Sequence, residues 1–201
     1  DQHAKLEKGQ SVRDVLRTAF DELFKTESRI NDIYMSMAEE GADMDALMEE
    51  VGELQDRLES RDFYTLDAKI DEVARALGVM DYGMDTDVTE LSGGQRTKIL
   101  LAKLLLEKPD ILLLDEPTNY LDAEHIDWLK RYLQNYENAF VLISHDIPFL
   151  NDVINIVYHV ENQLLTRYSG DYYQFQEVHA MKRAQLEAAY ERQQKEIADL
   201  Q

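Results

Sequence analysis

Two adjacent carboxylates, Asp115 and Glu116, directly follow the apolar run Ile111–Leu114. A short apolar run between polar segments predicts a buried strand. Ligands of open α/β sheets bind beyond the carboxyl ends of the strands, so we expect both acids at a ligand site. There an Asp can hold Mg²⁺, and the next carboxylate can position or deprotonate an attacking water. The alternative is a pair of solvated loop acids, in a chain with 41 acidic residues.

A second polar set, Ser144-His145-Asp146, follows the next apolar run, Ala139–Ile143. Parallel strands end at the same edge of a sheet, so this set is expected near the two carboxylates. His145 could then donate a hydrogen bond to a phosphate oxygen. The alternative is a histidine with a structural role only.

The segment Leu91-Ser92-Gly93-Gly94-Gln95 stands just before a predicted helix. Two glycines allow another chain or a phosphate to approach the backbone, and the first turn of the helix offers free N–H groups. The alternative for this segment alone is a turn followed by a helix N-cap.

The elements before Leu91 are predicted to be helices. Apolar residues at spacings of three and four predict an amphipathic helix over 11–37, capped by Ser11 and ended by Gly41. A second helix is predicted around 47–58 with one acidic face, and the two could form a helical hairpin. A third covers 66–77, with Gly78 placed like a C′ glycine.

After Leu91, helices alternate with short strands, which is the α/β pattern. Helices are predicted over 95–106 and 122–134, buried parallel strands over 111–114 and 139–143, and a hairpin turning at Glu161-Asn162. Beyond Gly170 the chain is expected to be helical. Its end carries a coiled-coil seam of Leu186, Tyr190, Gln193, Ile197 and Leu200.

The motifs LSGGQ, ILLLDEP, NYLD and SHD, in this order, resemble those of the ATP-binding cassette ATPases. The resemblance implies an α/β fold with the core of that P-loop NTPase class. It also implies that the signature Leu91–Gln95, through Ser92, Gly94 and Gln95, contacts the γ-phosphate of ATP held on an opposing cassette. Asp115 would then serve Mg²⁺ and Glu116 would be the catalytic base.

The same resemblance assigns three further positions. His145 matches the switch histidine, Leu121 and Asp122 match the D-loop, and Gln2 stands where the Q-loop glutamine would. ATP and Mg²⁺ are the only cofactors implied. The remaining histidines share no metal-ligand spacing and there is no cysteine, so we expect no structural zinc site.

No G-x-x-x-x-G-K-[ST] phosphate loop occurs in the sequence. The resemblance therefore covers the latter part of a cassette, and we expect the 201 residues to be a piece of a longer protein. The complete protein is expected to hydrolyse ATP, and the isolated piece to be inactive and to bind ATP weakly or not at all.

Three features resemble the ABC-F subfamily, whose soluble cassette proteins act on ribosomes: Asn119-Tyr120 after the strand, the long helical segment before Leu91, and the helix that follows Tyr172-Tyr173. The expected organisation is a Q-loop region over 1–10, a helical arm insertion over 11–64, the cassette remainder over 65–170 and the start of an interdomain linker over 171–201. A second nucleotide-binding domain of the same protein and the ribosome are the expected partners. The ATP-binding subunit of a membrane transporter and an interaction fragment without nucleotide chemistry remain as alternatives.

Composition narrows the class of protein. The net charge is −20, and between Asp21 and Asp87 there are 20 acidic and 6 basic residues, so free DNA is an unexpected partner. The longest apolar runs fall far short of the roughly 20 residues that span a bilayer. The first residues lack the features of a signal peptide, so we expect no membrane insertion and a cytoplasmic location.

Overall fold

The computed structural model describes residues 6–39 and 41–199. The expected Q-loop residue Gln2 and the seam residue Leu200 lie outside the described residues. The chain forms two compact units. The first comprises the described residues up to Leu112 with Asn119–Trp128 and Asn138–Phe140, and the second comprises Leu113–Thr118, Leu129–Glu137 and the residues from Val141 onward.

The first unit begins with α1, Val12–Arg17, capped as predicted by Ser11. The Ser11 hydroxyl accepts from the Asp14 N–H and the Asp14 carboxylate accepts from the Ser11 N–H, which is a capping box. The single helix predicted over 11–37 is interrupted by a 3-10 turn, η1 (Thr18–Phe20), before α2, Asp21–Ser36. The Thr18 hydroxyl donates to the Val15 carbonyl at 2.5 Å and so competes with the regular helical bonds.

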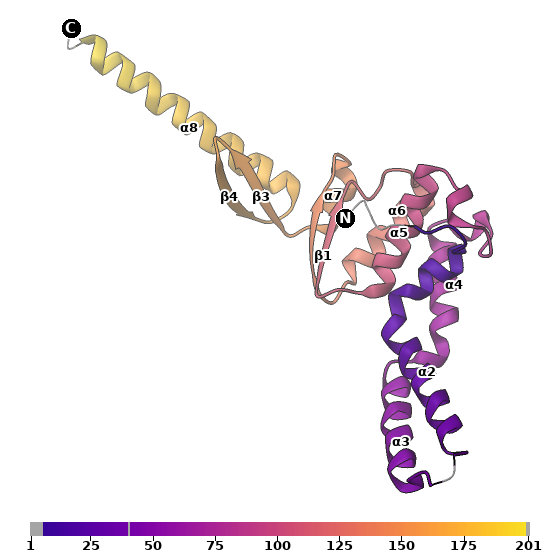
Figure 1. Cartoon of the computed structure of the whole chain (residues 1–201). Coiled ribbons are helices and arrows are strands. Elements are labelled where there is room, and N and C mark those ends of the chain that lie inside the picture. Colours follow the sequence, from indigo (N-terminus) through magenta and orange to yellow (C-terminus); the bar gives the residue numbers. More distant parts are fainter. Residues whose placement is uncertain (1–5, 40, 200–201) are drawn as a thin grey trace. The chain divides into compact units, whose positions relative to one another are not determined.

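α2 packs against α3, Met44–Ser60, as the predicted helical hairpin (Figure 1). Arg29 of α2 donates two hydrogen bonds to the Glu50 carboxylate of α3, from Nε to Oε1 at 2.9 Å and from Nη2 to Oε2 at 3.3 Å. The hairpin also has an apolar core of its own. The buried apolar residues are Leu23, Ile30, Ile33, Val51, Leu58, Phe63 and Leu66.

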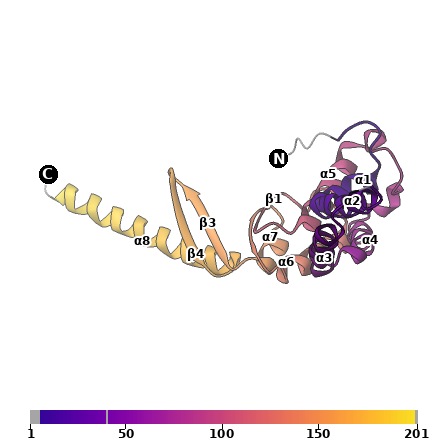
Figure 2. The same cartoon turned by 60° about the horizontal axis from the view of Figure 1, so that its bottom comes forward.

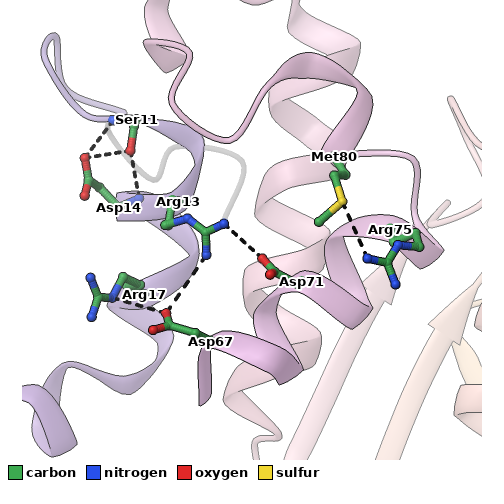
Figure 3. A network of polar contacts seen from close by, with 8 residues as sticks. All are labelled: Ser11, Arg13, Asp14, Arg17, Asp67, Asp71, Arg75 and Met80. Atoms are coloured by element: carbon green, nitrogen blue, oxygen red, sulfur yellow. Dashed lines mark hydrogen bonds and ion pairs between the residues drawn. The ribbon is translucent and has the colours of Figure 1, made fainter. Parts of the chain in front are cut away.

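After the 3-10 turn η2 (Phe63–Thr65), α4 covers Leu66–Ala76. Ion pairs hold α1 beside α4 in Figure 3, from Arg13 to Asp71 at 3.0 Å and from Arg17 to Asp67 at 3.8 Å. Gly78 ends α4 as predicted. It has a φ of +68°, and the N–H groups of Gly78 and Val79 return to carbonyls of the last turn, which is a Schellman motif.

α5 covers Gly93–Glu107 after the 3-10 turns η3 (Met80–Tyr82) and η4 (Val88–Glu90). β1 (Ile111–Asp115), α6 (Ala123–Gln134) and β2 (Ala139–Ile143) follow in the predicted order, and β1 and β2 pair in one sheet. The N–H of Glu116, just after β1, donates at 2.8 Å to the carbonyl of Ile143, the last residue of β2. The carboxyl ends of the two strands therefore adjoin, as parallel pairing requires.

The prediction that both strands are buried is wrong for one of their faces. Leu112 and Leu114 are buried, whereas Ile111 and Leu113 are 63% and 66% exposed. β2 likewise exposes Val141 and Ile143. Successive side chains of a strand point to opposite faces, and within the described residues only one face of this sheet is covered.

The second unit contains α7 (Ile147–Val153), β3 (Ile156–Glu161), β4 (Leu164–Ser169) and α8 (Tyr172–Asp199). The β3–β4 hairpin turns at Asn162-Gln163, one residue later than predicted, with both residues at positive φ. The hairpin packs against the first part of α8 (Figure 2).

The seam predicted along α8 has no covering element among the described residues. Leu186 and Tyr190 are exposed, as is Ile197. Its pairing with a second helix stays a prediction. No helix in the described ranges has both the length and the apolar character needed to cross a membrane.

Candidate functional site

The end of β1 places two acids in different environments. The Asp115 side chain is exposed, and Glu116 is partly buried. Glu116 adopts a φ of +48°, a left-handed conformation that is uncommon for a residue with a side chain. Its N–H is anchored to the Ile143 carbonyl of β2. Backbone strain of this kind gathers at functional positions, because the surrounding structure must hold it in place.

The Glu116 carboxylate meets the residue that follows β2 by two positions. The His145 N–H donates to Glu116 Oε2 at 3.2 Å, and His145 Nε2 lies 3.5 Å from Glu116 Oε1. The Oε1 atom is buried and makes no hydrogen bond within the described structure. The His145 side chain is 97% exposed, so it can reach a ligand as well as the carboxylate. One acceptor is thus free, beside an accessible imidazole.

The signature turn sits at the start of α5. The Ser92 hydroxyl accepts from the Gln95 N–H at 3.3 Å, and the Gln95 side-chain oxygen accepts from the Ser92 N–H at 2.9 Å. This capping box uses both side chains to satisfy the first turn of the helix. The alternative of an N-cap is therefore correct as far as it goes, and a contact with a phosphate stays a prediction.

The two signature glycines differ in what surrounds them. A Cβ at Gly94 would lie 2.9 Å from Cδ1 of Tyr120, whereas a Cβ at Gly93 would meet nothing within 4 Å. Gly94 is needed so that the Tyr120 ring can lie against the helix, and Gly93 leaves the turn open to an incoming group. No sequence motif predicted this Tyr120 contact, although the adjacent pair of glycines signals a close approach.

The residues expected to form the D-loop, Leu121 and Asp122, lie just before α6. The Asp122 carboxylate accepts from the His125 N–H at 3.2 Å, in the manner of an N-cap, and lies 2.8 Å from His125 Nδ1. The His125 ring in turn covers Gly78, where a Cβ would lie 2.5 Å from Cε1. Leu121 is partly buried beside Asp122. His125 thus contacts both Asp122 and Gly78, which sequence patterns did not predict.

The predicted site residues therefore fall into two sets. Asp115, Glu116 and His145 belong to the second unit, where the structure brings Glu116 and His145 together. The signature and the D-loop belong to the first unit.

The strand-end set fits a nucleotide that carries a divalent cation. Asp115 offers exposed carboxylate oxygens of the hard type that Mg²⁺ prefers. Glu116 keeps a buried acceptor that makes no hydrogen bond, as a residue that must accept from a ligand or a water would.

Two family models match the chain, and both are described as ABC transporter. They cover residues 2–119 and 158–201. An uncharacterized ABC transporter ATP-binding protein of Bacillus subtilis, YfmM, is 66% identical over the whole chain. The energy-dependent translational throttle protein EttA of Haemophilus influenzae is 37% identical over 98% of the chain. The chain spans 39% and 35% of the lengths of these two relatives.

A solved structure of the ATP-binding subunit of an ABC transporter is similar in fold. It has a TM-score of 0.54 and 13% identity, over 82% of this chain and 55% of that one. At this identity the likeness concerns the fold alone.

Proposed function

The chain belongs to the ABC transporter family of ATP-binding cassettes, with ABC-F proteins among its relatives, and from this premise we propose that it hydrolyses ATP as part of an ABC-F protein that acts on the ribosome. The observation that carries the chemistry is the buried Oε1 of Glu116, which makes no hydrogen bond and lies 3.5 Å from His145 Nε2. The similarity to a translational throttle protein supports the ribosome as the place of action.

In this proposal Glu116 is the general base. Its free Oε1 accepts a proton from the water that attacks the terminal phosphate, and its second oxygen stays bonded to the His145 N–H. The exposed His145 ring donates to a phosphate oxygen as negative charge builds up there. General bases of this kind contribute about 10²–10⁴-fold to a rate.

Asp115 would hold Mg²⁺, directly or through water. Once bound, the cation would offset the negative charge on the phosphate oxygens. Asp115 and Glu116 are adjacent in the chain but differ in exposure, and we assign them different tasks. Asp115 attracts the cation and Glu116 handles the proton.

The signature would bind in trans to ATP held by a second nucleotide-binding domain of the same protein. The open space at Gly93 lets a phosphate approach the turn, and Ser92 and Gln95 would present polar groups to it. Leu91 precedes this turn, and the Asp122 D-loop would face the same opposing domain. The proposed Q-loop role of Gln2 concerns a residue outside the described ranges.

The helical arm, residues 11–64, would carry the contact with the ribosome. Its α3 exposes Glu49 and Glu53, whereas Glu50 is engaged with Arg29. An acidic face repels RNA phosphates, so its partner would be a basic ribosomal protein. Reversing Glu49 and Glu53 to Lys should weaken ribosome binding without breaking the Arg29 pair. Unchanged affinity would remove the arm from this role.

The test of the ribosome assignment is co-sedimentation of the complete protein carrying Glu116→Gln, with and without ATP. A variant that binds ATP without hydrolysing it should stay with ribosomes only when ATP is present. Recovery in the membrane fraction, with no ATP-dependent sedimentation, would favour the transporter alternative and overturn the proposal.

A further inference from the structure

Two histidines and a glutamate converge where the β3–β4 hairpin packs on α8. His159 and Glu161 are two residues apart on β3 and therefore share one face of the strand. His179 reaches them from α8, with its Nε2 at 3.3 Å from Glu161 Oε2. One ligand atom from each of the three residues lies within 4.8 Å of the others. Within the described ranges, this is the group that meets the geometry of a metal site.

We propose that His159, Glu161 and His179 bind a divalent transition-metal ion, with Zn²⁺ as the best chemical match, and that this ion fastens α8 to the hairpin. Imidazole nitrogens and a carboxylate oxygen are ligands that Zn²⁺ accepts, and water can complete a tetrahedral set. Zinc-ligand bonds of about 2.1 Å put tetrahedral ligand atoms about 3.4 Å apart. The Glu161–His179 pair already has this spacing, so small side-chain rotations would close the set.

Aromatic packing holds both imidazoles in place. The buried Phe175 ring lies 5.2 Å from the His159 ring and 5.5 Å from the His179 ring, between centroids. Tyr168 packs on Phe175 at 5.0 Å. The two histidine rings meet edge to face at 4.6 Å. An apolar wall that fixes the orientation of its ligands reduces what must be ordered when a metal binds.

The charges near the site favour a cation only in part. The half-exposed Glu161 carboxylate brings a negative charge to the site. Arg183, one turn beyond His179, opposes a cation, although its Nη2 is 3.9 Å from Glu187. Replacing Arg183 by Gln should therefore tighten metal binding.

A metal at this position would set where α8 leaves the body of its unit. His179 lies in the first third of the 28-residue helix, and the seam residues Leu186, Tyr190 and Ile197 are exposed. Joining β3 to α8 would keep the first turns of the helix from opening, because binding to the folded state alone stabilises it. This proposal departs from the sequence-based expectation of no structural zinc site, which depended on the spacing of the histidines along the chain. The fold brings the residues together, because His179 of α8 lies 18 residues beyond Glu161 of β3.

The experiment is calorimetric titration of the metal-free complete protein, without nucleotide, with ZnCl₂. We expect one Zn²⁺ to bind per protein molecule at this cluster. Glu161→Gln and His179→Gln should each weaken its binding by at least about tenfold. Glu191→Gln is the matched control, because Glu191 is an exposed residue of the same helix outside the cluster, and it should bind Zn²⁺ as the wild type does. Glu161 is half exposed and packs in no core, so its variant remains informative if His179→Gln fails to fold.

Hydrogen exchange tests separately whether the bound ion fastens α8 to the β3–β4 hairpin. Zn²⁺ should slow exchange in the first turns of α8 in the wild type and leave it unchanged in Glu161→Gln. The absence of saturable Zn²⁺ binding, or binding by both ligand variants as tight as that of the wild type, would overturn the metal site and leave the cluster as packing. Zn²⁺ binding that leaves exchange in α8 unchanged would overturn the proposal that the ion fastens this helix to the hairpin.

Discussion

The signature turn and the end of β1 both carry motif residues. They differ in how far the polar groups of these residues are already hydrogen-bonded within the protein. Ser92 and Gln95 satisfy each other in a closed capping box. Glu116 instead leaves one buried oxygen without a hydrogen bond. A polar group that already makes hydrogen bonds contributes to the stability of the fold. A buried oxygen without a hydrogen bond makes no such contribution, so it is available to a ligand or a water. We therefore expect substitutions around the signature to reduce stability, and substitutions at Glu116 to reduce activity.

The glycines near the signature and D-loop give the largest expected loss of stability. Gly78→Ala puts a side chain at a φ of +68° and within 2.5 Å of the His125 ring. The left-handed conformation costs roughly 1–2 kcal/mol and overpacking roughly 1–3 kcal/mol. We expect a loss of about 2–5 kcal/mol in the free energy of unfolding, measured by urea denaturation. Gly52→Ala, in an open position of α3, should instead be stabilising by about 0.5–1 kcal/mol.

A second pair of substitutions separates the two signature glycines. Gly94→Ala places a Cβ against Tyr120 and should cost about 1 kcal/mol, the low end of overpacking, because the exposed Tyr120 ring can move. Gly93→Ala meets open space and should leave the free energy of unfolding nearly unchanged. Thermal melts of both variants decide this. Equal losses at the two positions would mean that the Tyr120 contact has no energetic weight.

Loss of the signature cap should have an effect of similar or smaller size. Ser92→Ala removes the acceptor for the Gln95 N–H and should lower the free energy of unfolding by about 1 kcal/mol. Ser92→Thr keeps the hydroxyl and should recover most of that loss. A Ser92→Ala variant as stable as the wild type would contradict the assignment of this side chain as a cap.

The smallest effect distinguishes two capping boxes in one chain. The Ser11 box is closed by the Asp14 carboxylate, whose pKa is lowered chiefly by its hydrogen bond with the Ser11 backbone N–H. The folded-state pKa lies below the unfolded value, so this stabilisation is present above the unfolded pKa and is lost as pH falls through the folded one. The destabilisation by Asp14→Asn should therefore shrink as pH falls from 7 to 3. Gln95→Ala, at the amide-closed box, should show no such trend.

Where the sequence predicted structure well, the signal was local. Ser11 and Ser92 stand before helices with a partner three residues on, and Gly78 follows the last apolar position of α4. Caps of this kind depend on hydrogen bonds within one turn, so their residues are readable in order.

The spacing of apolar residues missed several other features. A 3-10 turn at Thr18–Phe20 interrupts the helix predicted over 11–37, and the short helix α7 follows β2. The periodicity of the apolar residues gave no sign of either. The turn at Asn162-Gln163 contains no glycine, so its residues do not announce their positive φ. Exposure of alternate residues in β1 depends on what covers the sheet, which no run of letters reveals.

The candidate site was predicted in part for the same reason. Asp115, Glu116 and His145 follow apolar runs, and parallel pairing was enough to expect Glu116 near His145. The contact of Tyr120 with Gly94 and the ring of His125 over Gly78 join segments far apart in the chain. Such contacts come from packing, and no residue type or spacing encodes them alone.

The most direct test of the central claim compares binding with hydrolysis in the complete protein carrying Glu116→Gln. Equilibrium MgATP binding and single-turnover hydrolysis should be measured on one preparation, with Glu137→Gln as an exposed control outside the site. We expect unchanged stability, retained ATP binding and hydrolysis slowed by at least about 10²-fold. Hydrolysis at the wild-type rate, with ATP bound as before, would remove Glu116 from its proposed role as the base.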